Sequence, residues 1–352
     1  MITVLIVEDS PVARDFLRHI LSADPEIQVI GTASDGVAAL DAVGRRRPDV
    51  ITMDIHMPRM DGLEATRKIM ETHPTPIVIV SSSMDTDEVT TTFRAIEAGA
   101  LAAVHRPQGL GHRGHEATAR ELIQTVKLMS EVKVVRRWPR PSGRQGMPTA
   151  LKAGVLRPLK ALQLVTIGAS TGGPPVLQTI LSGLPKDFPV PVLIVQHIAR
   201  GFVQGLVEWL TQSTGFPVRV AADGEQLLPG HAYVAPDEFH MHMSLTQRIA
   251  LSPDAPENGL RPSVSYLFRS AARLYGPHVI GVLLTGMGKD GAEELKFMKD
   301  KGAVTIVQDQ DSAAVHGMPG EAIKLDAATY VLSPDEMAPT LIRLVPKRGI
   351  ER

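Results

Sequence analysis

Residues 164–175 read LVTIGASTGGPP: a short apolar run leads into a turn of small residues, and two prolines follow. The apolar run has the length of a buried strand, and proline is well tolerated in the first turn of a helix. Small residues on both sides of Ser170 let the chain turn sharply with the serine hydroxyl exposed. The stretch therefore predicts a strand–turn–helix unit of a parallel α/β sheet.

Similar apolar runs, separated by helical patterns, recur on both sides of this stretch, which is typical of parallel sheets covered by helices. In the C-terminal part, further strands are expected at residues 191–196, 218–221, 278–284 and 303–307, with a hairpin-like insertion over 239–252. In the N-terminal part, strands are expected at residues 4–7, 27–30, 50–53, 77–80 and 101–105. The expected fold class is α/β, with two doubly wound parallel-sheet domains at residues 1–130 and 161–352.

The segment between these domains, residues 131–160, differs from both in charge. It carries 8 basic and 1 acidic side chains, against 13 and 18 in residues 1–130 and 16 and 19 in residues 161–352. Its prolines and glycines and its lack of a hydrophobic period predict an extended linker. A nucleic-acid contact is the alternative for this charge, but Trp138 is its only aromatic residue, so base stacking has little support.

Cysteine is absent from all 352 residues, which excludes disulfides, thiolate metal sites and a cysteine nucleophile. The apolar start, residues 1–7, has no basic flank, so we expect neither a signal peptide nor a membrane anchor, and a cytoplasmic location. No apolar stretch approaches the roughly 20 residues that span a bilayer. We therefore expect no membrane insertion, and any covalent catalyst is a serine, threonine, aspartate, lysine or tyrosine.

Acidic residues follow two strands of the N-terminal domain. Glu8 and Asp9 come directly after the first strand, and Asp54 comes after the third. The carboxyl ends of parallel strands gather at one edge of a sheet, where three carboxylates repel one another unless a hard cation such as Mg²⁺ neutralises them. This pattern suggests phosphoryl transfer to a carboxylate. In the alternative interpretation the acids are helix caps and solvated loop residues.

Two further residues at the same sheet edge favour phosphate chemistry. Ser81 ends the fourth strand, and Arg106 follows the fifth, so a hydroxyl and a cation can both meet phosphoryl oxygens. Together with VLIVEDSPVAR, DVITMDIHMPRMDGLEATRKI and PIVIVSSS, they make about the first 130 residues resemble the receiver domain of bacterial response regulators. The resemblance implies a flavodoxin-like fold and Mg²⁺-dependent phosphorylation.

The resemblance also implies a role for individual residues. Asp54 is the phosphoacceptor, Ser81 the switch hydroxyl and Arg106 a phosphate contact. The implied Mg²⁺ ligands are Glu8, Asp9, Asp54 and the backbone carbonyl of His56. Two positions depart from the family pattern: Arg106 stands where lysine is usual, and Ala103 stands where an aromatic switch residue is common, so the phosphate contact has a different geometry and no rotating ring is available.

Three polar residues follow strands of the C-terminal domain. Ser170 follows the first strand, His197 follows the strand at 191–196, and Asp290 lies just beyond the strand at 278–284. A hydroxyl, an imidazole and an orienting carboxylate could converge there. The alternatives are a phosphate-binding turn at Ser170, a hydrogen-bonded strand-end histidine, and a helix cap before the segment GAEELKFM for Asp290.

The chain order Ser, His, Asp differs from that of the α/β-hydrolases. The C-terminal domain instead resembles the CheB-type protein-glutamate methylesterases, over about residues 163–345. The resemblance is carried by GASTGG, by QHI followed by GFVQGLVEWL, by DGEQLLPGHAYVAP and by LLTGMGKDGAEEL. It implies a Rossmann-like catalytic domain in which Ser170 is the nucleophile, His197 the general base and acid, and Asp290 the residue that orients the imidazole.

The same resemblance implies that the backbone of Met287 donates to the oxyanion and that Thr171 neighbours the active site. The implied substrates are glutamate methyl esters on the cytoplasmic helices of methyl-accepting chemoreceptors, hydrolysed through an acyl-enzyme without a cofactor. Glutamine deamidation is open as a second activity. A chemotaxis-type histidine kinase is the implied phosphodonor, and phosphorylation is implied to regulate the esterase.

Three alternatives to this hypothesis are open, and two of them differ from it in class. The first is a catalytically silent docking module, and the second is an esterase whose receiver is not phosphorylated. The third is a DNA-binding response regulator, but no helix-turn-helix pattern follows the first domain, so we expect no nucleic-acid partner. The histidine pairs His240/His242 and His112/His115 are interpreted as core or solvated residues, because neither has an evident third metal ligand nearby.

Overall fold

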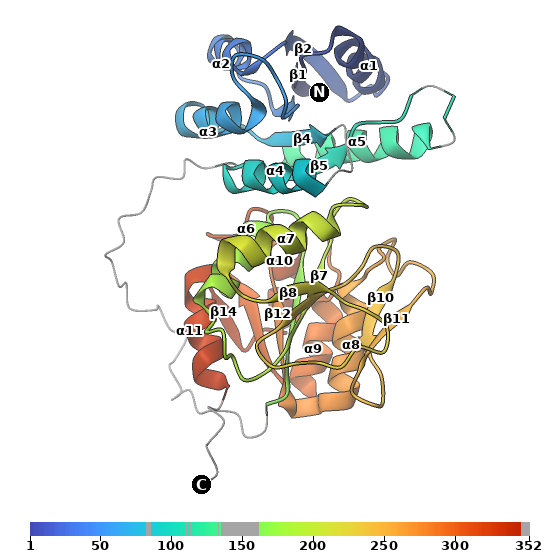
Figure 1. The fold of residues 1–352 in the computed structure, drawn as a ribbon, viewed down its shortest axis with the longest axis vertical. Helices are drawn as coiled ribbons and strands as arrows, with labels where there is room; N and C mark the ends of the chain where they lie inside the picture. Colours follow the sequence, from blue (N-terminus) through green and yellow to red (C-terminus); the bar gives the residue numbers. More distant parts are fainter. Residues whose placement is uncertain (82–85, 110, 113, 133, 135–161, 346–352) are drawn as a thin grey trace. The chain divides into compact units, whose positions relative to one another are not determined.

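The computed structural model describes residues 1–81, 86–109, 111–112, 114–132, 134 and 162–345. The chain divides into two compact units, Met1–Gln145 and Gly146–Arg352, each built on its own parallel sheet (Figure 1). Most of the expected linker lies outside the described residues, so its boundaries stay a prediction. Within the described ranges, no helix combines the length and the apolar character needed to cross a membrane.

The first unit contains five parallel strands in the order β2-β1-β3-β4-β5, with helices between consecutive strands. This confirms the doubly wound fold and its five expected strands. Val7 at the end of β1 pairs with Met53 at the end of β3, so the residues that follow these strands are neighbours. The elements are β1 (Ile2–Val7), α1 (Pro11–Ser22), β2 (Ile27–Ala33), α2 (Gly36–Arg45), β3 (Val50–Met53), α3 (Gly62–Thr72), β4 (Ile77–Ser81), α4 (Thr86–Glu97), β5 (Ala102–His105) and α5 (His115–Ser130).

Three helices of the first unit, α1, α2 and α3, begin at capping side chains. The Ser10 hydroxyl oxygen accepts a hydrogen bond from the Ala13 amide at 3.4 Å, and the Asp61 carboxylate accepts one from the Glu64 amide at 2.8 Å. Each acceptor satisfies an amide that has no partner within its own helix. The cap of α1 is therefore Ser10, and not Glu8 or Asp9, which the alternative interpretation treated as helix caps.

The second unit contains seven parallel strands in the order β14-β13-β12-β6-β7-β9-β8. Strand β6, which carries the serine turn, lies between β12 and β7, and these are the strands that lead to Asp290 and His197. The elements are β6 (Leu164–Ala169), α6 (Gly173–Gly183), β7 (Val192–Gln196), α7 (Val203–Thr214), β8 (Val218–Val220), β9 (Ala232–Val234), β10 (His240–Met243), β11 (Ile249–Ser252), α8 (Val264–Tyr275), a 3₁₀ turn (Gly276–His278), β12 (Val279–Leu283), α9 (Ala292–Asp300), β13 (Val304–Gln308), α10 (Met318–Lys324), β14 (Tyr330–Leu332) and α11 (Pro334–Leu344).

Two strands of this sheet were not expected from the sequence. Strand β9 is only three residues long, although all three are buried. Strand β14 is equally short and lies at the sheet edge, where Val331 is exposed and its two neighbours are half-buried. At β9 the four-residue apolar run AYVA is the shortest that predicts a buried strand and was missed, whereas the YVL of β14 is too short.

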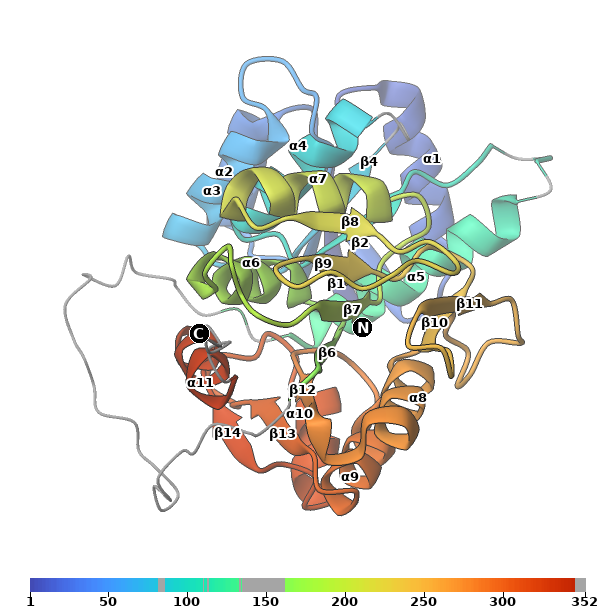
Figure 2. The same ribbon diagram turned by 60° about the horizontal axis from the view of Figure 1, so that its bottom comes forward.

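The expected hairpin insertion is present as the antiparallel pair β10–β11, which packs beside α8 (Figure 2). His240 stacks on the Tyr266 ring with centroids 4.5 Å apart, and His242 meets the same ring edge-on at 5.5 Å. The two histidines therefore pack around an aromatic ring of α8, which supports their interpretation as packing residues.

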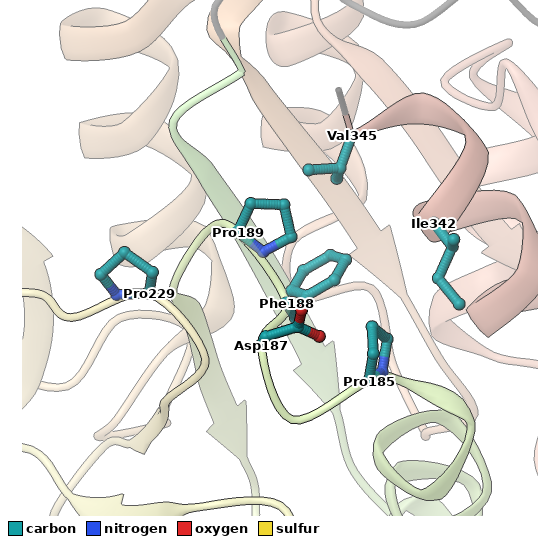
Figure 3. Close-up of a pocket in the computed structure, with 7 residues that line it drawn as sticks. All are labelled: Pro185, Asp187, Phe188, Pro189, Pro229, Ile342 and Val345. Atoms are coloured by element: carbon teal, nitrogen blue, oxygen red, sulfur yellow. The ribbon is translucent and has the colours of Figure 1, made fainter. Parts of the chain in front are cut away.

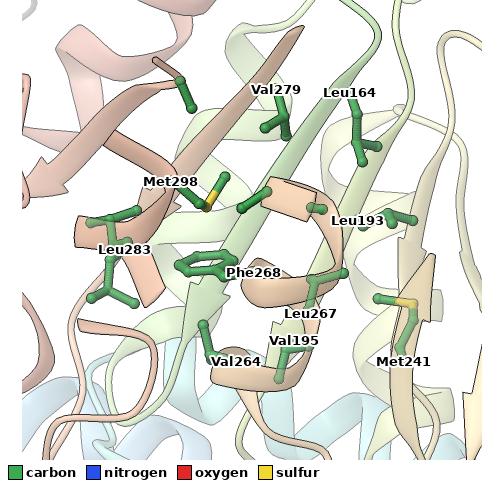
Figure 4. Packing of buried hydrophobic residues seen from close by; sticks show 14 of the residues in the cluster. Leu164, Leu193, Val195, Met241, Val264, Leu267, Phe268, Val279, Leu283 and Met298 are labelled. Carbon is green, nitrogen blue, oxygen red and sulfur yellow. The ribbon is translucent and has the colours of Figure 1, made fainter. Parts of the chain in front are cut away.

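Helix α8 packs its apolar face against the sheet and fixes the position of its own first turn (Figure 4). Its first residue, Val264, is fully buried between Gly168 at the end of β6 and Gly291 after β12. A Cβ atom at Gly168 would lie 2.3 Å from Val264 Cγ1, and one at Gly291 would lie 2.5 Å from it. Glycine at both positions therefore lets the start of α8 approach the strand ends beside Ser170 and Asp290.

Candidate active site and receiver site

Ser170 lies on the tight turn between β6 and α6. Its backbone amide donates to the carbonyl oxygen of Thr285 at 3.0 Å, and the Gly173 amide donates to the Ser170 carbonyl at 2.8 Å. Gly172 has φ +76°, which L side chains rarely adopt, and a Cβ there would lie 2.5 Å from the Cβ of Ala314. The turn thus needs glycine at position 172, and Ser170 itself stays half-buried.

His197 lies next to Ser170 because their strands are paired. Ala169 is in register with Gln196, and the His197 amide donates to the Ala169 carbonyl at 2.9 Å. The residue after each of these positions therefore stands at the same sheet edge. The His197 side chain is 10% exposed, so solvent reaches only a small part of the ring.

Asp290 lies against the imidazole of His197. The two groups approach to 2.9 Å between His197 Nε2 and Asp290 Oδ2, although the Nε2–H bond does not point at the carboxylate with hydrogen-bond alignment. Catalytic hydrogen bonds are often loose before substrate binds. The structure therefore brings the three residues Ser170, His197 and Asp290 to one sheet edge, with close contact between the last two.

The Asp290 carboxylate has further donors in the first turn of α8. Its Oδ1 accepts from the Ser263 hydroxyl at 2.8 Å and from the Ser265 amide at 3.1 Å, and its Oδ2 accepts from the Val264 amide at 2.7 Å. Burial raises the pKa of this carboxyl, but the His197 side chain and the α8 donors outweigh burial and hold the pKa at about 2. Asp290 is therefore a stable anion at the N-terminus of a helix, where negative charge is favoured.

The helix-cap interpretation of Asp290 needs a correction. In the alternative interpretation Asp290 caps the helix that follows it, α9, but the cap of α9 is Gly291, with φ +84°. The carboxylate instead satisfies the first amides of α8, and the Gly291 amide donates to the Ser265 hydroxyl at 2.9 Å. A cap supplied from about 25 positions away cannot be predicted from local sequence spacing.

Thr285 is a residue of the site that the sequence analysis missed. It is fully buried at the end of β12. Its hydroxyl donates to the Thr171 carbonyl at 2.9 Å, and its backbone carbonyl accepts from the Ser170 amide at 3.0 Å. Thr285 therefore holds the serine turn from the side opposite His197. Its only sequence signal is a hydroxyl residue directly after an apolar strand.

Met287 lies in the loop that packs against the serine. A Cβ at the preceding residue, Gly286, would lie 2.6 Å from Ser170 Cβ, so the backbone there approaches the serine closely. Within the described part of the chain, neither the Met287 amide nor the Thr171 amide donates a hydrogen bond. Two unpaired amides beside a serine hydroxyl have the composition of an oxyanion hole.

The acids of the first unit also converge. One ligand oxygen from each of Glu8, Asp9 and Asp54 lies within 4.8 Å of the others. Burial and the nearby Asp54 charge raise the pKa of Glu8 to about 7, and burial raises the pKa of Asp54 as well. Crowded, desolvated carboxylates of this kind fit a small hard cation, because Mg²⁺ takes carboxylate oxygens and supplies the missing charge.

Arg106 lies beside these acids, but it contacts Glu8 more closely than Asp54. Its Nη2 is 2.8 Å from Glu8 Oε2 and 3.8 Å from Asp54 Oδ1. The Arg106 amide also donates to the Ser81 carbonyl at 2.7 Å, so the hydroxyl residue and the cation share one edge. Ser81 is fully buried, and Ala103 is 8% exposed on β5.

The backbone around Asp54 is equally tight. The Ile55 amide donates to Asp54 Oδ1 at 2.9 Å, which fixes the carboxylate. A Cβ at Gly62 would lie 2.0 Å from the Asp54 carbonyl oxygen, so only glycine fits at the start of α3. The side chain of His56 is exposed, yet its charge acts to lower the pKa of Asp54, so the residue lies near the acids.

A separate cavity lies at the end of the second sheet where strands such as β7 begin (Figure 3). Several of its residues precede β7 in the sequence, whereas Ser170 and His197 follow the carboxyl ends of strands. It therefore lies outside the candidate active site. The lining residues are Pro185, Asp187, Phe188, Pro189, Pro229, Ile342 and Val345.

The fold and the two sites define a class of protein: a serine-hydrolase-like α/β domain joined to a doubly wound domain with a carboxylate site. Residues 165–341 match the family model described as CheB methylesterase, and residues 4–112 match the response regulator receiver domain. The chain therefore belongs to the CheB methylesterase family and carries a receiver domain, as the resemblance implied.

Individual relatives agree with this family. A protein-glutamate methylesterase/protein-glutamine glutaminase of Nitrosospira multiformis is 58% identical over 99% of this chain and 98% of its own length. A protein of the same description from Geobacter metallireducens is 58% identical over 99% of this chain and all of its own length. The crystal structure of the Thermotoga maritima CheB methylesterase catalytic domain is 38% identical, with a TM-score of 0.51, over 52% of this chain and 98% of that one. The chain is thus an enzyme of the methylesterase class.

Proposed function

We propose that this enzyme hydrolyses glutamate methyl esters on the cytoplasmic helices of methyl-accepting chemoreceptors. The observation that carries the proposal is the set Ser170, His197 and Asp290 at one sheet edge, with Asp290 held as an anion by the first turn of α8. The names of the two relatives support glutamate as the esterified residue. We place the enzyme in the cytoplasm, where these helices lie.

In the proposed mechanism, the Ser170 oxygen attacks the ester carbonyl while His197 takes the hydroxyl proton. Asp290 stabilises the imidazolium that forms and holds the ring in place. The Met287 and Thr171 amides donate to the oxyanion. His197 then gives its proton to the departing methoxide, which leaves as methanol. The acyl group stays bound to Ser170 as an acyl-enzyme. Water attacks the acyl group with His197 as base, and it releases glutamate and free Ser170.

The same acyl-enzyme also permits glutamine deamidation. A side-chain amide would acylate Ser170 in the same way, with ammonia leaving in place of methanol. The relatives' descriptions include protein-glutamine glutaminase, which favours this second activity. Neither reaction draws on a metal or an organic cofactor in this proposal.

For the receiver, we propose that a chemotaxis-type histidine kinase is the phosphodonor and Asp54 the acceptor. Mg²⁺ would be held by Glu8, Asp9, Asp54 and the backbone carbonyl of His56. The ion supplies positive charge to the phosphoryl oxygens, while Ser81 and Arg106 provide a hydroxyl and a cation to the same group. Arginine in this place is bulkier than lysine and already paired with Glu8, so we expect slow or short-lived phosphorylation.

We further propose that phosphorylation of Asp54 raises the esterase rate. The proposed domain limits are residues 1–130 for the receiver and 161–352 for the esterase, with a linker at 131–160. The single test is methanol release from a methylated chemoreceptor, measured with and without a small-molecule phosphodonor and Mg²⁺. Allosteric coupling typically changes an equilibrium by about 5- to 150-fold, so the difference should be measurable. Absence of methanol would favour the docking module, and equal rates would favour an esterase whose receiver is not phosphorylated.

A further inference from the structure

The side chain of Gln196 lies between the backbones of Ser170 and His197. Its Nε2 donates to the Ser170 carbonyl and to the His197 carbonyl, both at 2.8 Å. Because both partners are acceptors, only the NH₂ end of the carboxamide can face them, which fixes the orientation of the group. Gln196 is 3% exposed, so water does not compete for these contacts.

The Ser170 carbonyl belongs to the same peptide unit as the Thr171 amide. In a trans peptide the C=O and N–H bonds point in opposite directions, so a donor that holds the carbonyl also sets the direction of the amide. The Gly173 amide donates to the same carbonyl, which therefore has two donors. Hydrogen bonds to a carbonyl polarise the amide and strengthen its N–H as a donor.

We infer that Gln196 is a positioning residue for ester hydrolysis: it aims the Thr171 amide at the oxyanion and fixes the spacing of Ser170 and His197. This inference rests on the proposed function of the same site. The species served is the tetrahedral oxyanion that forms when Ser170 attacks an acyl group. Removing one oxyanion donor from a serine hydrolase costs about 10²- to 10³-fold in kcat, which sets the scale for a misaimed amide.

The room around the carboxamide supports this role. A Cβ at Gly173 would lie 2.2 Å from Gln196 Oε1, so glycine is required for the carboxamide to take this position. Oε1 is buried and has no hydrogen-bond partner among the described residues. An unpaired buried acceptor destabilises the fold, so the carboxamide is better explained by its two donor contacts at the site than by stability.

Gln308 provides a matched control. Strand β7 reads VLIVQ and β13 reads VTIVQ, and each ends in a buried glutamine. Gln308 uses its other end: Oε1 accepts from the Thr285 amide at 2.8 Å, and Nε2 donates to the Ser312 hydroxyl at 3.2 Å. A Gln→Glu change therefore replaces the donor that faces the site at position 196, but it keeps the acceptor at position 308. Both changes bury a carboxyl group.

The experiment compares Q196E, Q196M and Q308E in the full-length protein, with methanol release from a methylated chemoreceptor as the readout. We expect kcat to fall about 100-fold in Q196E and Q196M while KM changes less than about threefold. Q308E keeps its acceptor for the Thr285 amide and loses only the donor to Ser312, so its kcat should fall much less than that of Q196E. A role in folding alone would lower the amount of active enzyme, but it would not lower kcat per folded molecule, which thermal unfolding and circular dichroism will check.

Two outcomes overturn the inference: equal kcat losses in Q196E and Q308E, or wild-type kcat in a folded Q196M. Q196M, which has a similar length and no charge, decides the matter if Q196E fails to fold. The variant S170A separates this inference from the proposed function. An active S170A would remove both, whereas an inactive S170A beside a fully active Q196M would remove the role of Gln196 alone.

Discussion

The two units place carboxylates in the same position, just beyond the carboxyl ends of parallel strands, yet their surroundings differ. Glu8 and Asp54 are buried beside one another, and burial raises the pKa of both. Asp290 is also buried, but its pKa is lowered to about 2. The difference lies in the surroundings: Asp290 accepts three hydrogen bonds at the start of α8, and the His197 imidazole lies 2.9 Å from it.

This contrast shows how one topology provides two kinds of chemistry. A carboxylate with several hydrogen-bond donors stays ionised without a bound cation, and it can stabilise an imidazolium. In a cluster of carboxylates with few donors, the negative charge is balanced only when a cation binds. Arg106 supplies part of that charge through Glu8, and the remainder fits Mg²⁺.

The largest expected effect tests whether the two sites are chemically separate. Ser170→Ala should abolish methanol release, because triad nucleophiles can account for about 10⁶-fold in turnover. The same variant should still incorporate phosphoryl groups at Asp54, as intact-mass spectrometry will show. Retention of more than about a tenth of wild-type esterase activity would contradict the nucleophile assignment.

The next largest effect tests the role of the ionised Asp290 carboxylate in catalysis. Asp290→Asn should lower kcat by about 10⁴-fold, the scale of the equivalent change in another serine hydrolase, because the amide cannot stabilise the imidazolium. The loss should be smaller than for Ser170→Ala. Wild-type kcat in a folded Asp290→Asn protein would leave the carboxylate as a helix cap alone.

The same residue makes a prediction for stability against pH. The pKa of Asp290 lies at about 2 when folded, against 3.8 in the unfolded chain, so ionised Asp290 adds about 2 kcal/mol to the unfolding free energy above pH 4. This contribution is lost as the pH falls from about 4 toward 2. In urea titrations, the stability gap between wild type and Asp290→Asn should be roughly half as large at pH 3 as at pH 6. A gap that does not change with pH would mean that charge is not its source.

The sequence was sufficient to predict which polar residues stand at strand ends, because an apolar run followed directly by Ser170, His197 or Asp54 is visible in the chain. It was insufficient where a partner comes from a distant element. Ser263 and Ser265 reach Asp290 from a helix about 25 positions earlier, and no local pattern connects them. Similarly, a strand-end glutamine is visible at position 196, but the sequence does not show which end of its carboxamide faces the site.

Among the strands, those with long buried runs were predictable from the sequence. Strands such as β6, which has six consecutive buried residues, were predicted from their apolar runs. Strands β9 and β14, three residues each, pair with longer neighbours, β7 and β13. Strand formation there depends on a sheet that already exists, which the segment alone cannot reveal.

The smallest expected effect tests the carboxylate cluster of Glu8, Asp9 and Asp54. Its effect on the unfolding free energy has the opposite sign to that of the Asp290 substitution. Asp54→Asn removes one of three carboxyl groups whose oxygens lie within 4.8 Å, and it keeps an acceptor for the Ile55 amide. Without Mg²⁺, the variant should therefore gain about 1 kcal/mol in unfolding free energy, a modest value because Arg106 already offsets part of the repulsion. Added Mg²⁺ should stabilise wild type by binding its folded state and close the gap. Asp290→Asn, measured beside it, should be less stable than wild type at neutral pH with or without Mg²⁺. If Asp54→Asn were less stable than wild type and Mg²⁺ made no difference, the protein itself would compensate the charge of the receiver's acids, as it does for Asp290. The contrast between the two sites would then fail.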